Sequence, residues 1–472
     1  MRRTKIVCTI GPASFSPEVI QQLIEAGMDV ARLNFSHGTH DQHEEVIARV
    51  REISQRLLRP VAILQDLQGL KIRLGTFRGG RATLESGTEF LISTRAREGT
   101  AGGASTTYDR LPRDVKPGDR LLIADGLIEL RVLGADETTV RCRVVTGGEV
   151  SDHKGINLPG VAISAGSMTS KDQADLQFGI RQGVDYVAVS FVRGPADVLE
   201  VKELLDGAGA SIPVIAKLEK PEAIQRLDDI LRVADGVMVA RGDLGVELPL
   251  EEVPLIQKQV IRRARERAIP VITATQMLES MIEHPRPTRA EASDVANAIL
   301  DGTDAVMLSA ETAVGKYPVE TVRVMSRIAD QADQALPPLA AAATVGRAST
   351  FPDVISDAAC RAAREVRARV IVAFTQSGST ARLLAKYRPE VPIFAFSPSE
   401  HIRRRLCLTW GVVPKIIRPI QHTDELVEEI EAALLAEQTV HVGDALVIVA
   451  GAPMWVRGTT NLIKLHRVEA RG

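Results

Sequence analysis

The chain has 472 residues, which exceeds an ordinary single domain and predicts roughly two to four domains. Its apolar content of 45% and charged content of 25% are those of a globular protein. A formal net charge of -2 and an aromatic content of 3% argue against a nucleic-acid-binding protein. No apolar run reaches the length of a membrane span, so we expect no membrane partner.

The four cysteines, Cys8, Cys142, Cys360 and Cys407, stand far apart in the sequence. Their spacing predicts neither a disulfide framework nor a zinc site. The first residues are basic, but the apolar stretch that follows is broken too early for a signal peptide. The expected location is therefore the cytoplasm.

Eight apolar runs with the character of buried strands alternate with helical patterns along the chain. The runs are Lys5–Thr9, Val30–Phe35, Val61–Asp66, Asp185–Phe191, Val214–Glu219, Gly236–Asp243, Pro270–Gln276 and Asp304–Thr312. Such alternation indicates parallel strands in βα units, and eight units predict a (β/α)8 TIM barrel in the α/β class. We assign residues 1–69 and 166–335 to this barrel and expect its chemistry at the carboxyl ends of the strands.

Residues 70–165 interrupt the barrel after its third strand. This stretch loses helical periodicity and gains strand-like alternation, as in Arg120–Ala124, Leu127–Leu133 and Thr138–Val145. The pair Asp125-Gly126 between two such runs predicts a hairpin. We therefore expect an inserted all-β domain, a β-barrel lid that closes over the active-site end.

Residues 336–350 are rich in alanine and proline and predict a linker, and residues 351–472 predict a separate C-terminal α/β domain. One segment of that domain follows a strand and opens a helix. It contains Thr375, Ser377, Gly378, Ser379 and Thr380. These hydroxyl and N–H groups suit a bound phosphate, but they suit an ordinary helix cap equally well.

Two carboxylates, Glu219 and Asp243, follow neighbouring barrel strands. Each alone would more commonly cap a helix or pair with an arginine. Together they resemble a Mg²⁺ site, which needs few protein ligands. Because side chains alternate along a strand, Lys217 lies on the same face as Glu219. The combination favours a phosphorylated, anionic substrate held through a divalent cation.

Further polar residues follow the second and third strands: Arg32, Asn34, Ser36, His37 and Arg73. Arginines at strand ends favour binding of phosphate or carboxylate over a surface role. The repeat His37, His40, His43 resembles a metal cluster. Its three-residue spacing drifts off one helix face, so we favour a helix start with histidines on the exposed side.

Six motifs stand out for their specificity: Thr4–Ser14, Val30–Gly38, Lys154–Gly160, Val237–Gly245, Thr273–Ile282 and Pro285–Asp304. Together they make the chain similar to bacterial pyruvate kinases over essentially its whole length. The resemblance implies transfer of a phosphoryl group from phosphoenolpyruvate to ADP, which gives pyruvate and ATP in the last step of glycolysis. It also implies Mg²⁺ or Mn²⁺ as the cofactor.

Residue by residue, the resemblance assigns Glu219 and Asp243 to the divalent cation. It assigns the N–H groups of Gly242 and Asp243 to the substrate carboxylate, and Lys217 to the transferred phosphoryl group. Arg32 and Arg73 would clamp that group and its acceptor, and Thr275 and Ser309 would serve protonation of the enolate. The expected nucleotide contacts are Asn34, His37, Arg73 and Lys154, the last on the lid.

Many members of this family need a monovalent cation near Asn34, Ser36, Asp66 and Leu67, and they carry a glutamate at the position of Lys71. The combination of Lys71 with Gln68 and Leu74 resembles the potassium-independent branch. The lysine ammonium would take the place of the ion, so we expect no requirement for K⁺.

The resemblance also implies a homotetramer and a phosphorylated allosteric effector at the Thr375–Thr380 loop. Two alternatives remain. The first is a lyase that acts on phosphoenolpyruvate or pyruvate on a related barrel, although it would lack an ADP site and a lid with Lys154. The second is a non-enzymatic metabolite sensor, although every expected catalytic residue is present.

Overall fold

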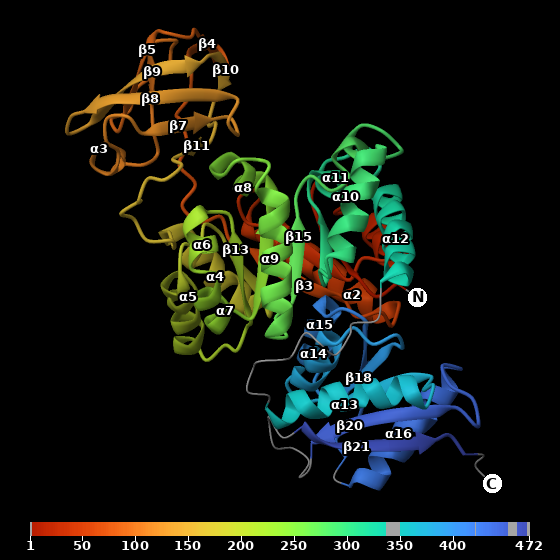
Figure 1. Ribbon diagram of the computed structural model, residues 1–472. Helices are drawn as coiled ribbons and strands as arrows, with labels where there is room; N and C mark the ends of the chain where they lie inside the picture. The colour runs from red at the N-terminus through yellow and green to blue at the C-terminus, as the bar shows by residue number, and fades with distance from the viewer. Residues whose placement is uncertain (1, 337–349, 421, 452–459, 470–472) are drawn as a thin grey trace.

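The computed structural model describes residues 2–336, 350–420, 422–451 and 460–469. Figure 1 shows a β-rich lid at one end, a helix-covered barrel in the middle and an α/β domain at the other end. This arrangement confirms the expected fold class. Most of the expected linker, residues 336–350, lies outside the described residues. None of the described helices combines the length and the apolar character needed to cross a bilayer.

The barrel closes in the order β1-β16-β15-β14-β13-β12-β3-β2, with parallel neighbours. Its strands are β1 (Lys5–Thr9), β2 (Val30–Asn34), β3 (Ala62–Asp66), β12 (Tyr186–Val189), β13 (Val214–Leu218), β14 (Gly236–Ala240), β15 (Val271–Ala274) and β16 (Ala305–Leu308). All eight expected strands are present. Several are shorter than expected because the polar ends of the runs leave the sheet at the barrel rim, where Arg241 and Ala310 begin helices.

Helices surround the barrel in Figure 1. They are α1 (Pro17–Ala26), α2 (His40–Arg56), α4 (Ser170–Gln182), α5 (Pro195–Gly207), α6 (Pro221–Gln225), α7 (Leu227–Val233), α8 (Arg241–Glu247), α9 (Val253–Glu266), α10 (Arg289–Leu300), α11 (Ala310–Ala313) and α12 (Pro318–Ala335), with the short 3-10 helix η2 (Glu279–Ile282). Three of them begin at capping boxes, on Thr39, Thr169 and Thr288. Each such cap stabilises its helix by about 1 kcal/mol.

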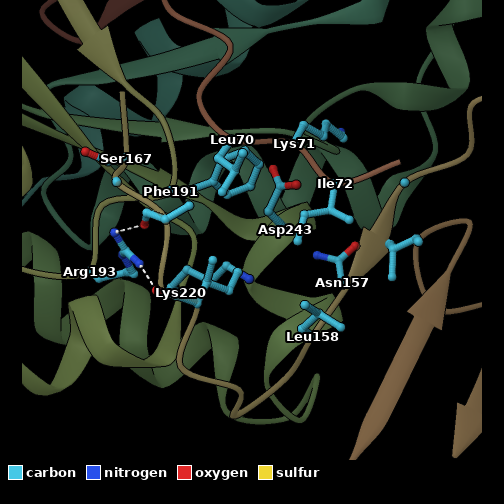
Figure 2. Close-up of a pocket in the computed structure, with 15 residues that line it drawn as sticks. Leu70, Lys71, Ile72, Asn157, Leu158, Ser167, Phe191, Arg193, Lys220 and Asp243 are labelled. Atoms are coloured by element: carbon cyan, nitrogen blue, oxygen red, sulfur yellow. Dashed lines mark hydrogen bonds between the residues drawn. The ribbon is translucent and has the colours of Figure 1, made fainter. Parts of the chain in front are cut away.

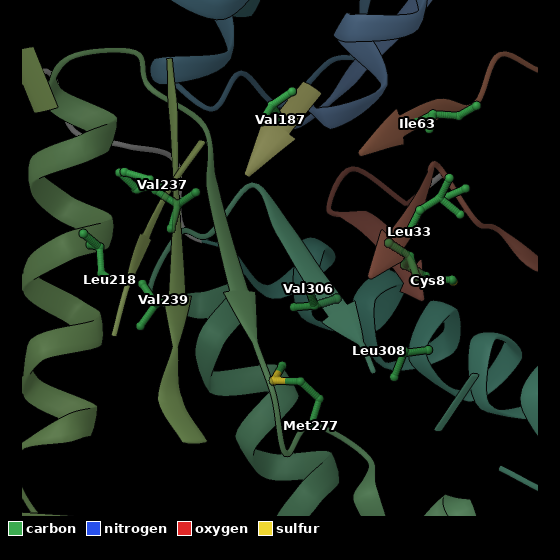
Figure 3. Close-up of a cluster of buried hydrophobic side chains, with 14 of the residues drawn as sticks. Cys8, Leu33, Ile63, Val187, Leu218, Val237, Val239, Met277, Val306 and Leu308 are labelled. Carbon is green, nitrogen blue, oxygen red and sulfur yellow. The ribbon is translucent and has the colours of Figure 1, made fainter. Parts of the chain in front are cut away.

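Strand side chains alternate between two buried layers. Those that face the helices include Cys8, Leu33 and Ile63, which Figure 3 shows within one apolar cluster. Those that face the barrel interior include Val7 and Ile215. Continued along β13, this alternation points Lys217 into the barrel mouth, as period-two geometry requires.

The lid has its own apolar core. It consists of a six-stranded sheet in the order β11-β7-β8-β9-β5-β6 and a two-stranded ribbon of β10 and β4. The strands are β4 (Arg81–Leu84), β5 (Glu89–Ser93), β6 (Gly103–Ser105), β7 (Arg120–Ile123), β8 (Ile128–Ala135), β9 (Thr139–Thr146), β10 (Gly148–Ser151) and β11 (Ile156–Asn157). The expected inserted β lid is thus present, and its strands form this sheet and ribbon. The edge strands β6 and β11 have only 3 and 2 residues, and a one-turn helix, α3 (Leu111–Asp114), is also present.

The C-terminal domain is a five-stranded sheet in the order β19-β18-β17-β20-β21. Four strands are parallel and β21 is antiparallel. Its elements are α13 (Phe351–Glu365), β17 (Val370–Phe374), α14 (Ser379–Lys386), β18 (Ile393–Ser397), α15 (Glu400–Arg405), β19 (Val412–Ile416), α16 (Thr423–Ala436), β20 (Ala445–Gly451) and β21 (Thr460–Arg467). Apolar clusters cover both faces of the sheet, as in a doubly covered α/β domain.

A short turn of this domain closes the amino-terminal end of the barrel. Cys407 and Leu408 from the 3-10 turn η4 (Leu406–Leu408) join the cluster that fills the barrel interior. Tyr186 Oη donates to the Arg405 carbonyl at 2.7 Å, and Arg388 Nη1 lies 3.0 Å from Asp304 Oδ1. The barrel therefore has one end sealed by the C-terminal domain and the other end, at the carboxyl ends of its strands, facing the lid.

Candidate active site

Lys217 lies at the centre of a buried ion-pair cluster at the carboxyl ends of the barrel strands. Its Nζ is 2.9 Å from Glu219 Oε1 and 3.2 Å from Asp66 Oδ1. It also donates to Ser190 Oγ at 2.7 Å. On the far side of the cluster, Arg32 Nε lies 2.7 Å from Asp66 Oδ2. The fold thus brings together four charged residues, which the sequence placed at the ends of three separate strands: Arg32, Asp66, Lys217 and Glu219.

The charges of this cluster stabilise one another. Burial lowers the pKa of Lys217, but the carboxylates of Asp66 and Glu219 raise it by more, so that it ends above its ordinary value. Burial raises the pKa of Asp66, but Lys217 and Arg32 lower it to below its ordinary value. Lys217 is therefore an ammonium and Asp66 a carboxylate at neutral pH.

The environment of the Glu219 side chain disfavours its negative charge. Burial is the main reason that its pKa lies above the ordinary value; Lys217 opposes this shift and the nearby Asp243 adds to it. Its Oε2 accepts a hydrogen bond from the Phe191 N–H at 2.6 Å. A divalent cation beside Glu219 and Asp243 would offset both the cost of burying the Glu219 charge and the repulsion between the two carboxylates. Among the described residues, no group of three or more such metal-binding side chains occurs, and Mg²⁺ commonly uses fewer.

The loop after β15 contacts the start of α8. The Gly242 N–H donates to Thr275 Oγ1 at 2.8 Å. Thr275 and Gln276 have φ values of 67° and 54°, a left-handed conformation that is costly for a β-branched residue. Arg241 stabilises this backbone, because its Nη2 donates to the Thr275 carbonyl at 2.8 Å and its Nη1 lies 2.7 Å from Asp294 Oδ2.

Ser309 follows β16 at the same end of the barrel. Its N–H donates to Glu311 Oε2 at 2.6 Å, whereas its Oγ is buried without a hydrogen-bond partner among the described residues. Buried hydroxyls are rarely left unpaired in folded proteins. The Ser309 hydroxyl is therefore available to a bound molecule.

Positive charges gather around His37. Partial burial and then the charges of Arg73, Lys71 and Arg32 lower the pKa of His37, which leaves the ring neutral at pH 7. Arg73 Nη1 donates to the His153 carbonyl of the lid at 3.0 Å. Lys154 is exposed on the lid.

A cleft separates the lid from the barrel. Figure 2 shows Lys71, Ile72 and Asn157 on the lid side and Lys220 and Asp243 on the barrel side. Lys71 thus lines this cleft, whereas Asp66 is paired with Arg32 and Lys217. The expected replacement of a monovalent cation by Lys71 stays a prediction.

The histidines after β2 do not all lie on an exposed helix face. His43 is buried and stacks on Phe35, with ring centroids 4.1 Å apart, and its Nε2 lies 2.9 Å from the His37 carbonyl oxygen. His40 Nε2 lies 2.7 Å from Asp175 Oδ1. The expectation of exposed histidines is therefore wrong for His43, because packing against Phe35 was not visible in the spacing. The stacking of His43 on Phe35 and its contact with the His37 carbonyl stabilise the loop that carries His37.

The Thr375–Thr380 loop divides into two parts. Thr375 Oγ1 accepts from the Gly378 N–H at 2.9 Å, and Thr380 Oγ1 lies 2.7 Å from Thr460 Oγ1, so both hydroxyls are used within the domain. Ser377 and Ser379 are half-buried, with their Oγ atoms 3.0 Å apart. Gly378 is the N-cap of α14, and within the described part of the chain no side-chain cap hydrogen bond is formed there. The helix cap that the sequence left open as an alternative is thus not formed by Ser377 or Ser379.

Three supporting residues were missed in the sequence. Ser190 accepts from Lys217 and donates to the Leu67 carbonyl at 2.7 Å. Arg241 fixes the backbone of Thr275, and Glu311 fixes that of Ser309. Each of these three residues stands at the polar end of an expected strand. That position was the only feature of the sequence that could have indicated a role in the site.

The family model described as "Pyruvate kinase, barrel domain" matches residues 1–322 of this chain, and "Pyruvate kinase, alpha/beta domain" matches residues 353–466. Curated pyruvate kinases from Corynebacterium glutamicum and Mycobacterium tuberculosis are each 51% identical to it. These alignments cover 98% and 99% of this chain and 97% and 98% of the relatives.

A solved structure shows the same architecture. The crystal structure of a pyruvate kinase from Cryptosporidium parvum superposes with a TM-score of 0.93 at 37% sequence identity. The match covers 99% of this chain and 96% of that one. The similarity therefore includes the barrel, the lid and the C-terminal domain.

Proposed function

This chain belongs to the pyruvate kinase family and is a phosphotransferase, and from that premise we propose where and how it transfers the phosphoryl group of phosphoenolpyruvate to ADP. The reaction takes place at the buried cluster around Lys217. The observation that carries the proposal is the pairing of Lys217 with Asp66 and Glu219, which fixes an ammonium at the carboxyl end of a barrel strand. TIM-barrel enzymes place their chemistry at that end.

Charge neutralisation is the main task of the site. Phosphoryl transfer needs positioning and stabilisation of spread negative charge more than covalent chemistry. Lys217 and Arg32 supply positive charge to the transferred group, and Arg73 acts between it and the acceptor. Asp66 contacts both Lys217 and Arg32, so these cations are oriented before substrate binds.

Glu219 and Asp243 are the residues that would hold Mg²⁺ or Mn²⁺. When bound, the ion neutralises negative charge on the oxygens of the substrate. The N–H groups of Gly242 and Asp243, at the start of α8, bind the substrate carboxylate. The Gly242 N–H donates to Thr275 in this structure, so substrate binding exchanges that hydrogen bond for one to the carboxylate.

Thr275 and Ser309 serve the second half of the reaction. Loss of the phosphoryl group leaves an enolate, which must take up a proton at carbon to give pyruvate. The Ser309 hydroxyl, which has no hydrogen-bond partner among the described residues, supports a role in ordering the water that delivers this proton.

The nucleotide binds between the loop after β2 and the lid, through Asn34, His37, Arg73 and Lys154. A neutral His37 binds by hydrogen bonding, because its pKa is lowered. Lys71 supplies the positive charge that other enzymes take from K⁺ near Asn34, Ser36, Asp66 and Leu67. The reaction is therefore independent of potassium.

The loop Thr375–Thr380 binds the phosphate of an allosteric activator. The N-terminus of α14, where the N-cap is Gly378, supports this, because N–H groups at a helix start and the helix dipole favour an anion. Such regulation requires an effector that prefers the active arrangement of subunits. The assembly that we propose is a homotetramer in the cytoplasm.

One coupled assay tests this function. We expect ATP to form from phosphoenolpyruvate and ADP only when Mg²⁺ is present. Turnover of phosphoenolpyruvate or pyruvate without ADP would point to a lyase instead. The absence of any Mg²⁺-dependent turnover would leave the metabolite sensor as the better account.

A further inference from the structure

A buried carboxylate outside the proposed catalytic cluster connects the barrel to the lid. Glu247 is the last residue of α8, and its side chain is 1% exposed. Its Oε1 lies 2.5 Å from Lys220 Nζ and accepts from Asn157 Nδ2 at 3.0 Å. Its Oε2 is buried without a partner among the described residues. Burial of a carboxylate is costly unless it is paired, so these two contacts hold Glu247 in place.

Glu247 is linked to three parts of the proposed site, to two by its contacts with Lys220 and Asn157 and to the third by its own helix. Lys220 directly follows Glu219 just after the end of β13, and Asp243 lies one helical turn before Glu247 on α8. Residues four apart share one face of a helix. Asn157 belongs to β11, the lid strand that pairs with β7 and begins just after Lys154. Figure 2 shows Asn157, Lys220 and Asp243 around the same cleft.

The contact between Glu247 and Lys220 lies within the barrel, and the contact with Asn157 crosses to the lid. The Lys220 side chain is 10% exposed, and its Nζ lies 5.9 Å from the ring centroid of Phe191, whose N–H donates to Glu219. Lys220 is therefore fixed on the barrel. A lid movement that removed Asn157 would leave Glu247 with Lys220 as its only described partner.

We propose that Glu247 is a positioning residue that couples the position of the lid to the position of α8, and so to the cation site at Asp243. This inference rests on the proposed function, in which Asp243 holds Mg²⁺ and the lid closes over the nucleotide. Coupling between two equilibria is reciprocal. Mg²⁺ binding therefore stabilises the Asn157 contact as much as that contact stabilises the Mg²⁺ site.

The test is Asn157→Ala in the full-length chain, which keeps the ion pair of Glu247 with Lys220. We expect the half-saturating Mg²⁺ concentration and the KM for ADP each to rise about tenfold, with a smaller change in kcat, as for a lost hydrogen bond to a charged group. Ser86→Ala is the matched control, because it removes a hydrogen bond to the Gly147 N–H inside the lid. It should leave the Mg²⁺ titration unchanged.

A double-variant comparison separates coupling from a local effect on the lid. If Asn157 acts through Glu247, the combination of Asn157→Ala with Glu247→Gln should need no more Mg²⁺ than Glu247→Gln alone. Glu251→Gln, an exposed glutamate nearby, is the control for the charge change. If Glu247→Gln fails to fold, the single Asn157 variant still decides. The proposal is overturned if Asn157→Ala leaves the Mg²⁺ titration unchanged. It is also overturned if the effects of Asn157→Ala and Glu247→Gln on the Mg²⁺ requirement add fully in the double variant.

Hydrogen exchange supplies a readout that needs no turnover. Addition of Mg²⁺ should slow amide exchange in residues 154–158 of the parent chain and have no such effect in Asn157→Ala. If Mg²⁺ slows amide exchange in these residues equally in the parent chain and in Asn157→Ala, the coupling is overturned. If the parent shows the protection but forms no ATP, the proposed function fails while the coupling stands.

Discussion

The ammonium of Lys217 is buried, and its side chain is only 12% exposed. We expect Lys217→Met to reduce ATP formation by roughly 10²-fold or more, the cost of a lost electrostatic donor. It should also reduce stability by about 3–5 kcal/mol, because Glu219 stays buried without its ion-pair partner and Asp66 keeps only Arg32. Coupled assays and denaturant unfolding measure the two effects. Near-normal ATP formation would refute the role of Lys217.

A matched control exists for this change. Lys202 pairs with Asp235 at 2.8 Å, and these side chains are 30% and 40% exposed. Lys202→Met should leave activity unchanged and cost at most about 1 kcal/mol, as for surface ion pairs.

Glu219 allows a separate test of the metal site. We expect Glu219→Gln to raise the half-saturating Mg²⁺ concentration roughly 10-fold or more, since changes even to the partners of metal ligands have effects of this size. A Mg²⁺ titration of initial rates measures it. Glu203→Gln, at an exposed position, should behave as the parent. The same titration curve for Glu219→Gln and the parent would exclude Glu219 as a ligand.

The proposed role of Lys71 predicts the response to potassium. Because a tethered ammonium needs no binding equilibrium, we expect near-full activity in tetramethylammonium buffer. Lys71→Glu should introduce dependence on K⁺. A large stimulation of the parent enzyme by K⁺ would contradict this prediction.

At the residue scale, sequence reasoning works where strand periodicity applies. It placed Lys217 and Glu219 on one face, and the structure joins them in an ion pair. It did not find Ser190 or Arg241, because their contacts depend on how neighbouring strand ends meet in space. The burial of His43 was missed because its packing against Phe35 is not visible in the spacing of the histidines.

Among the elements, α14 and the loop before it carry the regulatory prediction. We expect replacement of Ser377 and Ser379 by glutamate to abolish activation by a phosphorylated metabolite, because added negative charge repels phosphate. Turnover at saturating phosphoenolpyruvate should stay unchanged. Substrate curves with and without the metabolite measure both quantities.

The outcome that contradicts this prediction is a normal response of the double variant. Ser377→Ala with Ser379→Ala is the matched control, since it removes the hydroxyls without adding charge. It should weaken activation less than the glutamate variant.

Long, buried elements were predictable and short ones were not. The strand β17 (Val370–Phe374) consists of five consecutive apolar residues, a pattern that indicates a buried strand. The strand β19 includes Pro414 and was missed, and so were β6 and β11, which are too short to show a period. Strands of this kind are defined by their pairing partners rather than by their own residues.

At the scale of the whole molecule, the barrel depends on the C-terminal domain. Leu408 is fully buried in the cluster that fills the barrel interior. We expect Leu408→Ala to reduce the free energy of unfolding by about 2–5 kcal/mol, as for other buried leucines. Denaturant unfolding of the full chain measures this change.

The control is Leu127→Ala, because the Leu127 side chain is 76% exposed on the lid. Its effect should be within about 0.5 kcal/mol. Equal stability of the Leu408 and Leu127 variants would show that the turn does not support the barrel.

The insertion of Cys407 and Leu408 also has a consequence during synthesis. All eight barrel strands leave the ribosome before the turn η4 does, since β16 ends at Leu308. Until η4 emerges, the apolar floor of the barrel is exposed to water and to other chains. We therefore expect the nascent protein to be prone to aggregation in this interval, until the C-terminal domain arrives.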